Sequence, residues 1–294
     1  MRATSTSALF AIVLLSLAST AFAGEPVKFI PHRAGTFRSE ACDVADFDKD
    51  GKLDIVAGPY LYLAPDWKAR KIRTLEGDVD SKGIGYWWDF MNLPLDVDGD
   101  GLLDVVSCSW HGMRSEWYRN TGVQGGEWPR AIIEQNGNFE CGDLWDLDGD
   151  GKALEILPHV QATVWYEVGP GPDGKRGVIR HVASTKPMEY GAGAGDVNGD
   201  GRPDIVRPDA WLEAPPDPRK GEWKVHPLAL GNMEEGKPEH TPQIWVYDVN
   251  ADGLADLVTS SAHRHGIFWY EQARKAPESA WKRHVIDASW TQAH

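Results

Sequence analysis

The chain of 294 residues has few cysteines, few positive charges and no long apolar run beyond its N-terminus. Its three cysteines, Cys42, Cys108 and Cys141, leave at least one thiol unpaired, which excludes a disulfide scaffold and favours buried, inert thiols. A bridge between Cys108 and Cys141 is the alternative. The net charge of −14 argues against nucleic acid as a partner, because an acidic protein repels phosphate. No later segment approaches the roughly 18 apolar residues of a membrane span.

Ordinary catalytic signatures are missing too. The sequence contains no G-x-S-x-G, no H-E-x-x-H, no phosphate-binding loop and no Asn-x-Ser/Thr acceptor. The glycine-rich run at 191–195 leads into an acidic loop rather than a helix. This run therefore predicts a tightly packed inner strand and not a dinucleotide site.

The N-terminus predicts export. Arg2 supplies a positive start, residues 8–17 an apolar stretch and residues 21–23 (AFA) a small-x-small cleavage site. We expect a signal peptide over residues 1–23 and a mature domain over 24–294. The protein would then be periplasmic, at the cell surface or secreted. A form that stays in the membrane is the alternative.

One feature is present in excess, an acidic loop that occurs five times. The copies begin at steps of 50, 50, 50 and 52 residues and read DFDKDGKLD, DVDGDGLLD, DLDGDGKALE, DVNGDGRPD and DVNADGLAD. Each supplies side-chain oxygens at positions one, three and five and a glycine at six, and four copies have an aspartate at nine. Ca²⁺ prefers such a ring of oxygens, closed by a glycine turn, so we expect up to five structural calcium ions.

The expected calcium ligands lie in loops 46–54, 96–104, 146–155, 196–204 and 248–256. They are Asp46, Asp48, Asp50, Asp54, Asp96, Asp98, Asp100, Asp104, Asp146, Asp148, Asp150, Glu155, Asp196, Asn198, Asp200, Asp204, Asp248, Asn250, Asp252 and Asp256. In the third copy Leu154 stands at position nine and Glu155 comes one residue late. Either a bulge and the longer side chain rescue this site or it is weak. Because metal-free loops crowd like charges together, folding is expected to depend on calcium.

The residues around each loop predict strands. Position twelve carries no acid in any copy, and apolar β-branched residues follow the loop, which excludes the helical EF-hand. A strand precedes each loop, as at 41–45 and 243–247. An aromatic strand comes later, as at Trp165-Tyr166, and a fourth strand usually opens with tryptophan, as at Trp223. Four short strands in about fifty residues are typical of one β-propeller blade.

These loops, each followed by a Trp-Tyr-Glu type of strand, resemble the FG-GAP/VCBS repeat family over residues 38–288. The family includes integrin α-subunit propellers and many exported bacterial proteins. The resemblance implies an all-β fold, a β-propeller of four-stranded blades with Ca²⁺ between the first two strands of each. Residues 27–30 resemble a lone fourth strand, and the terminal SWTQAH resembles the lead-in to another loop. Both indicate a ring that lacks its final blade or blades, or one that closes imperfectly. Five repeats are recognisable, and the complete form would have six or seven blades.

The family does not imply one function, since the fold hosts binding and catalysis alike. Opposite the calcium loops, the segments before each first strand and after each second strand are polar and aromatic. Loops on a rigid scaffold often carry binding residues, so we expect these segments to share one pocket. The candidate site residues are His111, His159, Arg207, His263 and His265. Scattered, unrelated surface residues are the alternative.

Two functions remain open at this stage. The first is an exported binding module for a carbohydrate or an extracellular protein, with Trp87 and Trp88 as an aromatic platform. The second is a sugar or polysaccharide lyase or dehydratase. In that case His263 and His265 would bind Zn²⁺ or a similar metal or act as base, with His111 and His159 as partners and Arg207 as an anion anchor.

Overall fold

The computed structural model describes residues 28–122, 126–171, 174–231, 238–275 and 280–293, and the chain divides into two units, residues 1–33 and 34–294. The signal peptide expected over residues 1–23 lies outside the described residues. The described residues contain no helix, and therefore none that is long and apolar enough to span a bilayer. Residues 28–33 of the first unit form no strand, so the lone fourth strand expected at 27–30 is not formed there.

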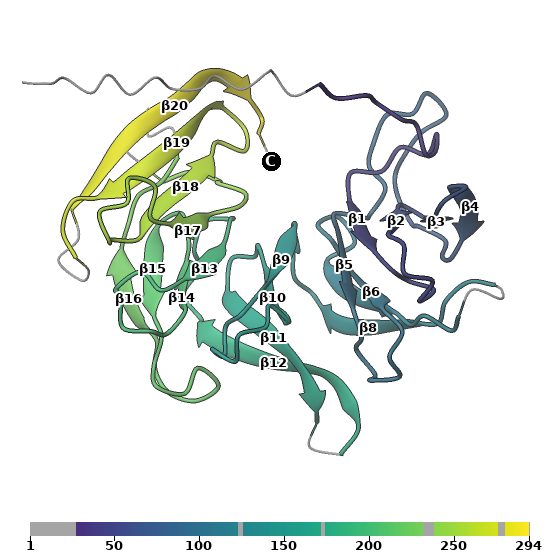
Figure 1. Cartoon of the computed structure of the whole chain (residues 1–294), viewed down its shortest axis with the longest axis horizontal. Coiled ribbons are helices and arrows are strands. Elements are labelled where there is room, and N and C mark those ends of the chain that lie inside the picture. Colours follow the sequence, from purple (N-terminus) through teal and green to yellow (C-terminus); the bar gives the residue numbers. More distant parts are fainter. Residues whose placement is uncertain (1–27, 123–125, 172–173, 232–237, 276–279, 294) are drawn as a thin grey trace, which may run out of the picture. The chain divides into compact units, whose positions relative to one another are not determined.

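The second unit consists of four-stranded antiparallel sheets whose strand order follows the chain (Figure 1). The strands of the first sheet are β1 (Cys42–Ala45), β2 (Asp54–Ala57), β3 (Tyr60–Leu63) and β4 (Lys68–Lys71). Those of the second are β5 (Met91–Leu95), β6 (Asp104–Ser109), β7 (Arg114–Tyr118) and β8 (Arg130–Gln135). Those of the third are β9 (Gly142–Trp145), β10 (Glu155–Pro158), β11 (Thr163–Pro170) and β12 (Arg176–Ser184).

Two more sheets complete the described part. The strands of the fourth are β13 (Gly193–Gly195), β14 (Asp204–Val206), β15 (Ala210–Glu213) and β16 (Lys224–Pro227). Those of the fifth are β17 (Trp245–Tyr247), β18 (Asp256–Ser260), β19 (His265–Gln272) and β20 (Trp281–Thr291). The all-β class and the four strands in each repeat are thus confirmed. The terminal SWT belongs to β20, the fourth strand of the fifth sheet.

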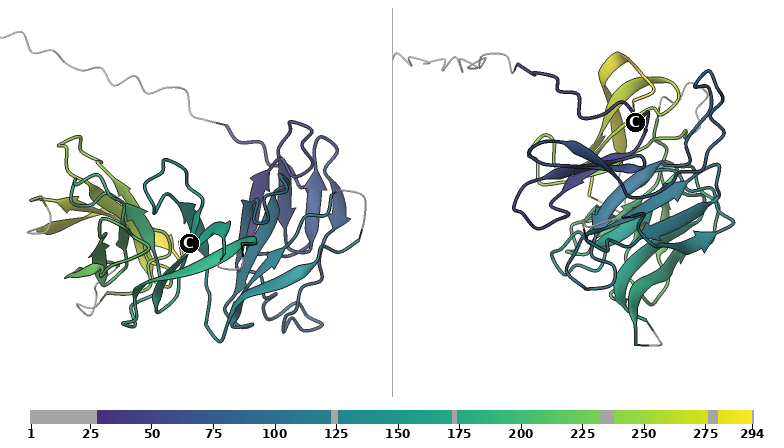
Figure 2. Two further views of the ribbon diagram at one scale, coloured as in Figure 1. Left: turned by 90° about the horizontal axis from the view of Figure 1, so that it is seen from below. Right: turned by 90° about the vertical axis from the view of Figure 1, so that its right-hand side faces the viewer.

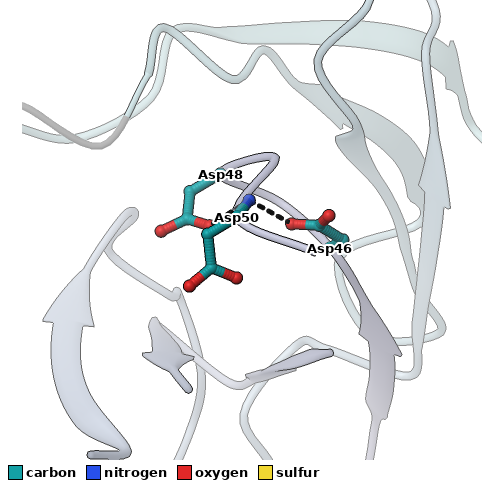
Figure 3. A group of neighbouring side chains, drawn as sticks. All are labelled: Asp46, Asp48 and Asp50. Atoms are coloured by element: carbon teal, nitrogen blue, oxygen red, sulfur yellow. Dashed lines mark hydrogen bonds between the residues drawn. The ribbon is translucent and has the colours of Figure 1, made fainter. Parts of the chain in front are cut away.

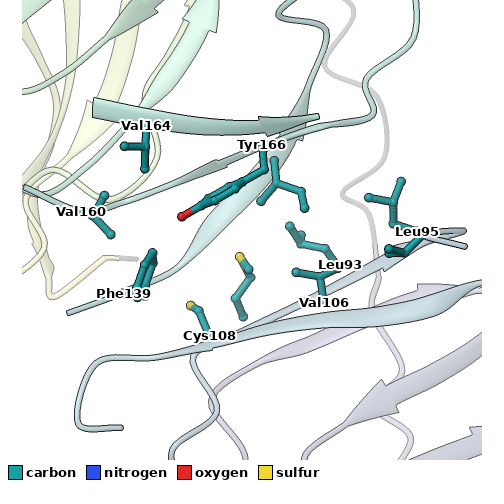
Figure 4. Packing of buried hydrophobic residues seen from close by; sticks show 11 residues of the cluster. Leu93, Leu95, Val106, Cys108, Phe139, Val160, Val164 and Tyr166 are labelled. Atoms are coloured by element: carbon teal, nitrogen blue, oxygen red, sulfur yellow. The ribbon is translucent and has the colours of Figure 1, made fainter. Parts of the chain in front are cut away.

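The second strands of the three middle sheets, β6, β10 and β14, are buried along their whole length, which explains the apolar residues that follow these loops. Successive side chains of a strand point to opposite faces, so Val105 packs with the first sheet and its neighbour Val106 with the third. Figure 4 shows the second case, in which Val106 and Leu93 lie against Tyr166 and Val164. Burial of such a side chain contributes about 1.5–3 kcal/mol. The apolar pairs after each loop therefore hold neighbouring sheets together.

Four clusters of buried residues occupy the contacts between consecutive sheets, from the first through to the fifth. Within the second unit the first strand of each sheet faces inward and the fourth lies at the rim (Figures 1 and 2). The first strands themselves touch where β1 meets β5, β5 meets β9 and β13 meets β17. At the last contact a Cβ on Gly193 would lie 1.7 Å from the carbonyl oxygen of Ile244. The prediction of a tightly packed inner strand at 191–195 is confirmed.

The burial of the residue at position two of each acidic loop shows which sheet faces have no neighbouring sheet packed against them. In the first four loops this residue is buried in the cluster with the next sheet, as Phe47, Val97, Leu147 and Val197. In the fifth loop the equivalent Val249 is 40% exposed. Among the described residues, no core cluster joins the fifth sheet to the first. The sheets are thus packed as a series with two free outer faces.

Candidate functional site

The acidic loops connect the first and second strands of every sheet, as expected from the sequence. In the first loop, carboxylate oxygens of Asp46, Asp48 and Asp50 lie within 4.8 Å of one another (Figure 3). The amide of Asp50 donates to Oδ1 of Asp46 at 3.1 Å, and the amide of Gly51 donates to its Oδ2 at 2.9 Å. Ligand atoms also lie within 4.8 Å of one another in the second loop, where they belong to Asp96, Asp98 and Asp104. The same holds in the third loop for Asp146, Asp148 and Glu155. These are the residues that could hold a divalent cation.

The carboxylate at position nine is buried and joins the loop to the end of the third strand. In the second loop, Oδ2 of Asp104 accepts the amide of Val97 at 3.1 Å, and Oδ1 accepts the amide of Asn120 at 2.7 Å. The same pair of bonds recurs at Asp54, Asp204 and Asp256. Burial raises the pKa of Asp104 to about 6 and that of Asp204 to about 7. A nearby cation would offset this cost, so the donor set fits a bound metal.

The third loop keeps the bond to the residue at position two despite its extra residue. Glu155 pairs with Trp145 in the sheet, as Asp104 pairs with Leu95, and its Oε2 accepts the amide of Leu147 at 2.9 Å. The insertion is therefore absorbed before β10 begins, and the longer side chain restores the contact. Of the two alternatives open at this loop, the geometry favours rescue.

A cavity of about 680 Å³ lies at the opposite end of these hairpins. Its lining residues come from the segments before first strands, from those after second strands and from the end of β20. They are Glu40, Tyr86, Phe90, Trp110, His111, Glu140, Cys141, His240, His263 and Gln292. The polar segments of four sheets thus converge on one cavity, as predicted from their place in the repeat.

Ring contacts connect the cavity wall from the second sheet to the fifth. Trp110 lies 4.6 Å from Tyr190, Tyr190 lies 5.2 Å from His240, and His240 lies 5.3 Å from His263, all between ring centroids. On the other side His111 stacks on Tyr86 at 5.1 Å. Flat apolar faces of this kind, with polar edges, suit a ligand that is itself part apolar and part polar.

The cavity wall is acidic. Among the described residues that line it there are two carboxylates, Glu40 and Glu140, and neither lysine nor arginine. Nε2 of His240 also lies 3.1 Å from the carboxylate of Glu189. A smaller cavity of about 270 Å³ adjoins at His240 and His263, where Arg264 pairs with Glu239 at 3.5 Å.

Two of the predicted site residues are buried beneath the cavity. Arg207 is fully buried and donates to the backbone carbonyls of Val160 and Glu189. Burial lowers its pKa to about 10. His159 is 1% exposed, and its Nδ1 lies 3.0 Å from Sγ of Cys141. Neither side chain is among the residues that line the cavity, so the role of Arg207 as an anion anchor stays a prediction.

The three cysteines are free. The thiol of Cys108 donates to the carbonyl of Glu140 at 2.7 Å, and burial raises the pKa of Cys141 to about 12. A thiol in that state is a poor nucleophile.

His263 and His265 are separated by the start of a strand. His263 lies on the cavity, whereas His265 opens β19, pairs with Thr291 and is not part of the lining. The predicted platform of Trp87 and Trp88 is also absent from the lining. Trp87 instead packs against Phe37, at 5.3 Å between ring centroids.

The lining residue Phe90 was not expected from the sequence, although the repeat contains a signal for it. Glu40, Phe90, Glu140 and Tyr190 each stand six residues before the first aspartate of their loop. All four line this cavity or the small space beside it. His111 and His263 are equivalent as well, because each stands fifteen residues after its loop begins. These two positions of the repeat hold half of the ten described residues that line the cavity.

Comparison with known proteins agrees with the repeat pattern. Residues 96–157 match the model of the FG-GAP-like repeat. This segment of the chain is thus an FG-GAP-like repeat. A search of curated proteins found no match for the chain. Among solved structures it is similar to the V. cholerae biofilm matrix protein Bap1, with 18% identity and a TM-score of 0.42 over 86% of this chain and 38% of that chain. The chain thus spans well under half the length of that protein.

Proposed function

We propose that this protein is an exported, calcium-stabilised β-propeller that binds a carbohydrate in the 680 Å³ cavity. The five sheets are its blades. Four consecutive cores with inward-facing first strands support this arrangement. The pattern of a signal peptide at residues 1–23 supports export.

Calcium is the cation that the loops favour. Each offers oxygens only, from aspartate or asparagine and from one buried acid, and hard cations prefer such ligands. Calcium at these positions would pin the first hairpin of each blade. It would thereby hold the far ends of the hairpins, which carry the cavity wall, in place.

The proposal of a carbohydrate ligand rests on the residues that line the cavity. Tyr86, Phe90 and Trp110 provide ring faces, and Glu140 and His263 provide polar atoms beside them. Sugars have an apolar face of C–H groups and a rim of hydroxyls, which match rings and hydrogen-bonding groups respectively.

Binding of short oligosaccharides by calorimetry tests this proposal. The Trp110→Ala variant should bind at least about tenfold more weakly, a loss of about 1.4 kcal/mol. Trp67→Ala is the matched control, because Trp67 is exposed and lies outside the cavity. Equal affinities for the two variants, or binding of a protein but of no sugar, would contradict the proposal.

A second candidate, a sugar lyase or dehydratase, is favoured by one observation. His240 and His263 lie with their rings 5.3 Å apart, and His240 contacts Glu189. This group could hold Zn²⁺ or provide a general base. The test is turnover on a panel of polysaccharides and keto-sugars, with and without added Zn²⁺. If His263→Ala leaves any observed turnover unchanged, the group is not catalytic.

A further inference from the structure

The charge of the cavity wall indicates which sugars the site prefers. Glu40 and Glu140 line it, and Glu189 lies behind His240. The nearby arginines form hydrogen bonds with other groups. Arg207 is buried against backbone carbonyls, and Arg38 donates to the carbonyl of Gly83 at 2.6 Å. Arg264, which lines the adjoining smaller cavity, pairs with Glu239 at 3.5 Å. An acidic sugar in the larger cavity would therefore meet Glu40 and Glu140 and, among the described lining residues, neither lysine nor arginine.

Aromatic rings line the same cavity as these carboxylates. The Trp110 indole and the Tyr86 ring belong to the same wall as Glu140. An ammonium group gains from an aromatic face through the ring quadrupole and from a carboxylate through a charge-assisted hydrogen bond. A neutral hydroxyl gains only the weaker hydrogen bond. The net charge of −14 also raises the local concentration of cations around the protein.

The backbone holds Glu140 in place. Its amide donates to the carbonyl of His159 at 3.3 Å, and its carbonyl accepts the thiol of Cys108 at 2.7 Å. The carboxylate is thus presented to the cavity from a fixed segment. Replacing it with the isosteric glutamine removes its charge and preserves these backbone contacts.

We propose that the cavity recognises amino sugars with a protonated amine, such as the glucosamine units of a deacetylated polysaccharide. The ammonium group lies between the Glu140 carboxylate and the Trp110 ring, and the hydroxyls contact the surrounding imidazoles. This inference rests on the proposed carbohydrate-binding function.

Calorimetric titration of the calcium-loaded protein at pH 6 tests the inference. The probes are trimers of glucosamine, N-acetylglucosamine, glucose and glucuronic acid, together with trilysine. The glucosamine trimer should bind about tenfold more tightly than the glucose trimer, as expected for one charge-assisted contact. In Glu140→Gln that ratio should fall towards one. In Asp66→Asn, which removes an exposed charge outside the cavity, it should persist.

The outcomes separate the two proposals. Equal binding of the glucosamine and glucose trimers, or tighter binding of the glucuronic acid trimer, overturns the preference for amines and leaves carbohydrate binding intact. Trilysine binding as tightly as the glucosamine trimer overturns the sugar class. If none of the sugar trimers binds, the proposed function itself falls. A preference that survives in Glu140→Gln shows that this carboxylate does not create it.

Discussion

The Asp104→Asn substitution should separate the role of calcium in the fold from that of the buried carboxylate. Burial raises the pKa of Asp104 to about 6. Keeping its charge at pH 7 therefore costs the metal-free fold about 1–2 kcal/mol after allowance for solvent screening. Asparagine removes this cost but loses one acceptor for the amide of Val97 or Asn120, about 1–3 kcal/mol. In chelator these two changes in the free energy of unfolding nearly cancel, so the melting temperature should change little.

In calcium the substitution also loses a charged ligand. A site at a hundred times its dissociation constant stabilises the fold by about 2.7 kcal/mol. Loss of that contribution should lower the melting temperature by about 5–10 °C. The assay is thermal unfolding of wild type and variant in excess Ca²⁺ and in excess chelator, followed by tryptophan fluorescence. Asp66→Asn, which changes an exposed charge outside the five acidic loops, is the control.

One pattern of results would refute this reasoning. If Asp104→Asn lowers the melting temperature equally in calcium and in chelator, the carboxylate acts only as an acceptor for the two amides. If calcium leaves the wild-type melting temperature unchanged, the loops do not bind it with useful affinity.

Three other predictions concern single contacts. Arg219 lies 2.6 Å from Oδ2 of Asp148 in the third loop, so Arg219→Gln should free that oxygen and tighten this calcium site by several-fold, measured by calcium titration. His226 stacks on Trp211 at 4.0 Å and lies 2.8 Å from the carboxylate of Glu213, whose pKa this hydrogen bond lowers. The resulting stabilisation is complete above about pH 4.5, the usual carboxyl pKa, and is lost as the pH falls through the lowered value, so Glu213→Gln should flatten the acid limb of melting temperature against pH. Gly193→Val should separate the fourth and fifth sheets and expose their core to a hydrophobic dye, whereas Gly177→Ala, with open space around it, should not.

Much of the fold could be predicted from short-range patterns. The period of about fifty residues, the strands on either side of each loop and the inner strand at 191–195 all follow from local sequence. Local rules suffice there because a loop and the two strands that it joins form one hairpin. The outcome at Glu155 was left open, because the sequence alone does not show where an inserted residue is absorbed.

Which side chains line the cavity could not be predicted from local sequence. His263 and His265 are two residues apart, yet only one lies on the cavity, because a strand begins between them. Arg207 belongs to a polar segment, but the packing of the sheets buries its side chain. Sequence by itself determined the repeat, the hairpins and the oxygen-rich loops, since each is a local arrangement of a few residues. Tertiary structure decided which side chains meet around the cavity, because that depends on how separate sheets pack and on which groups their packing buries.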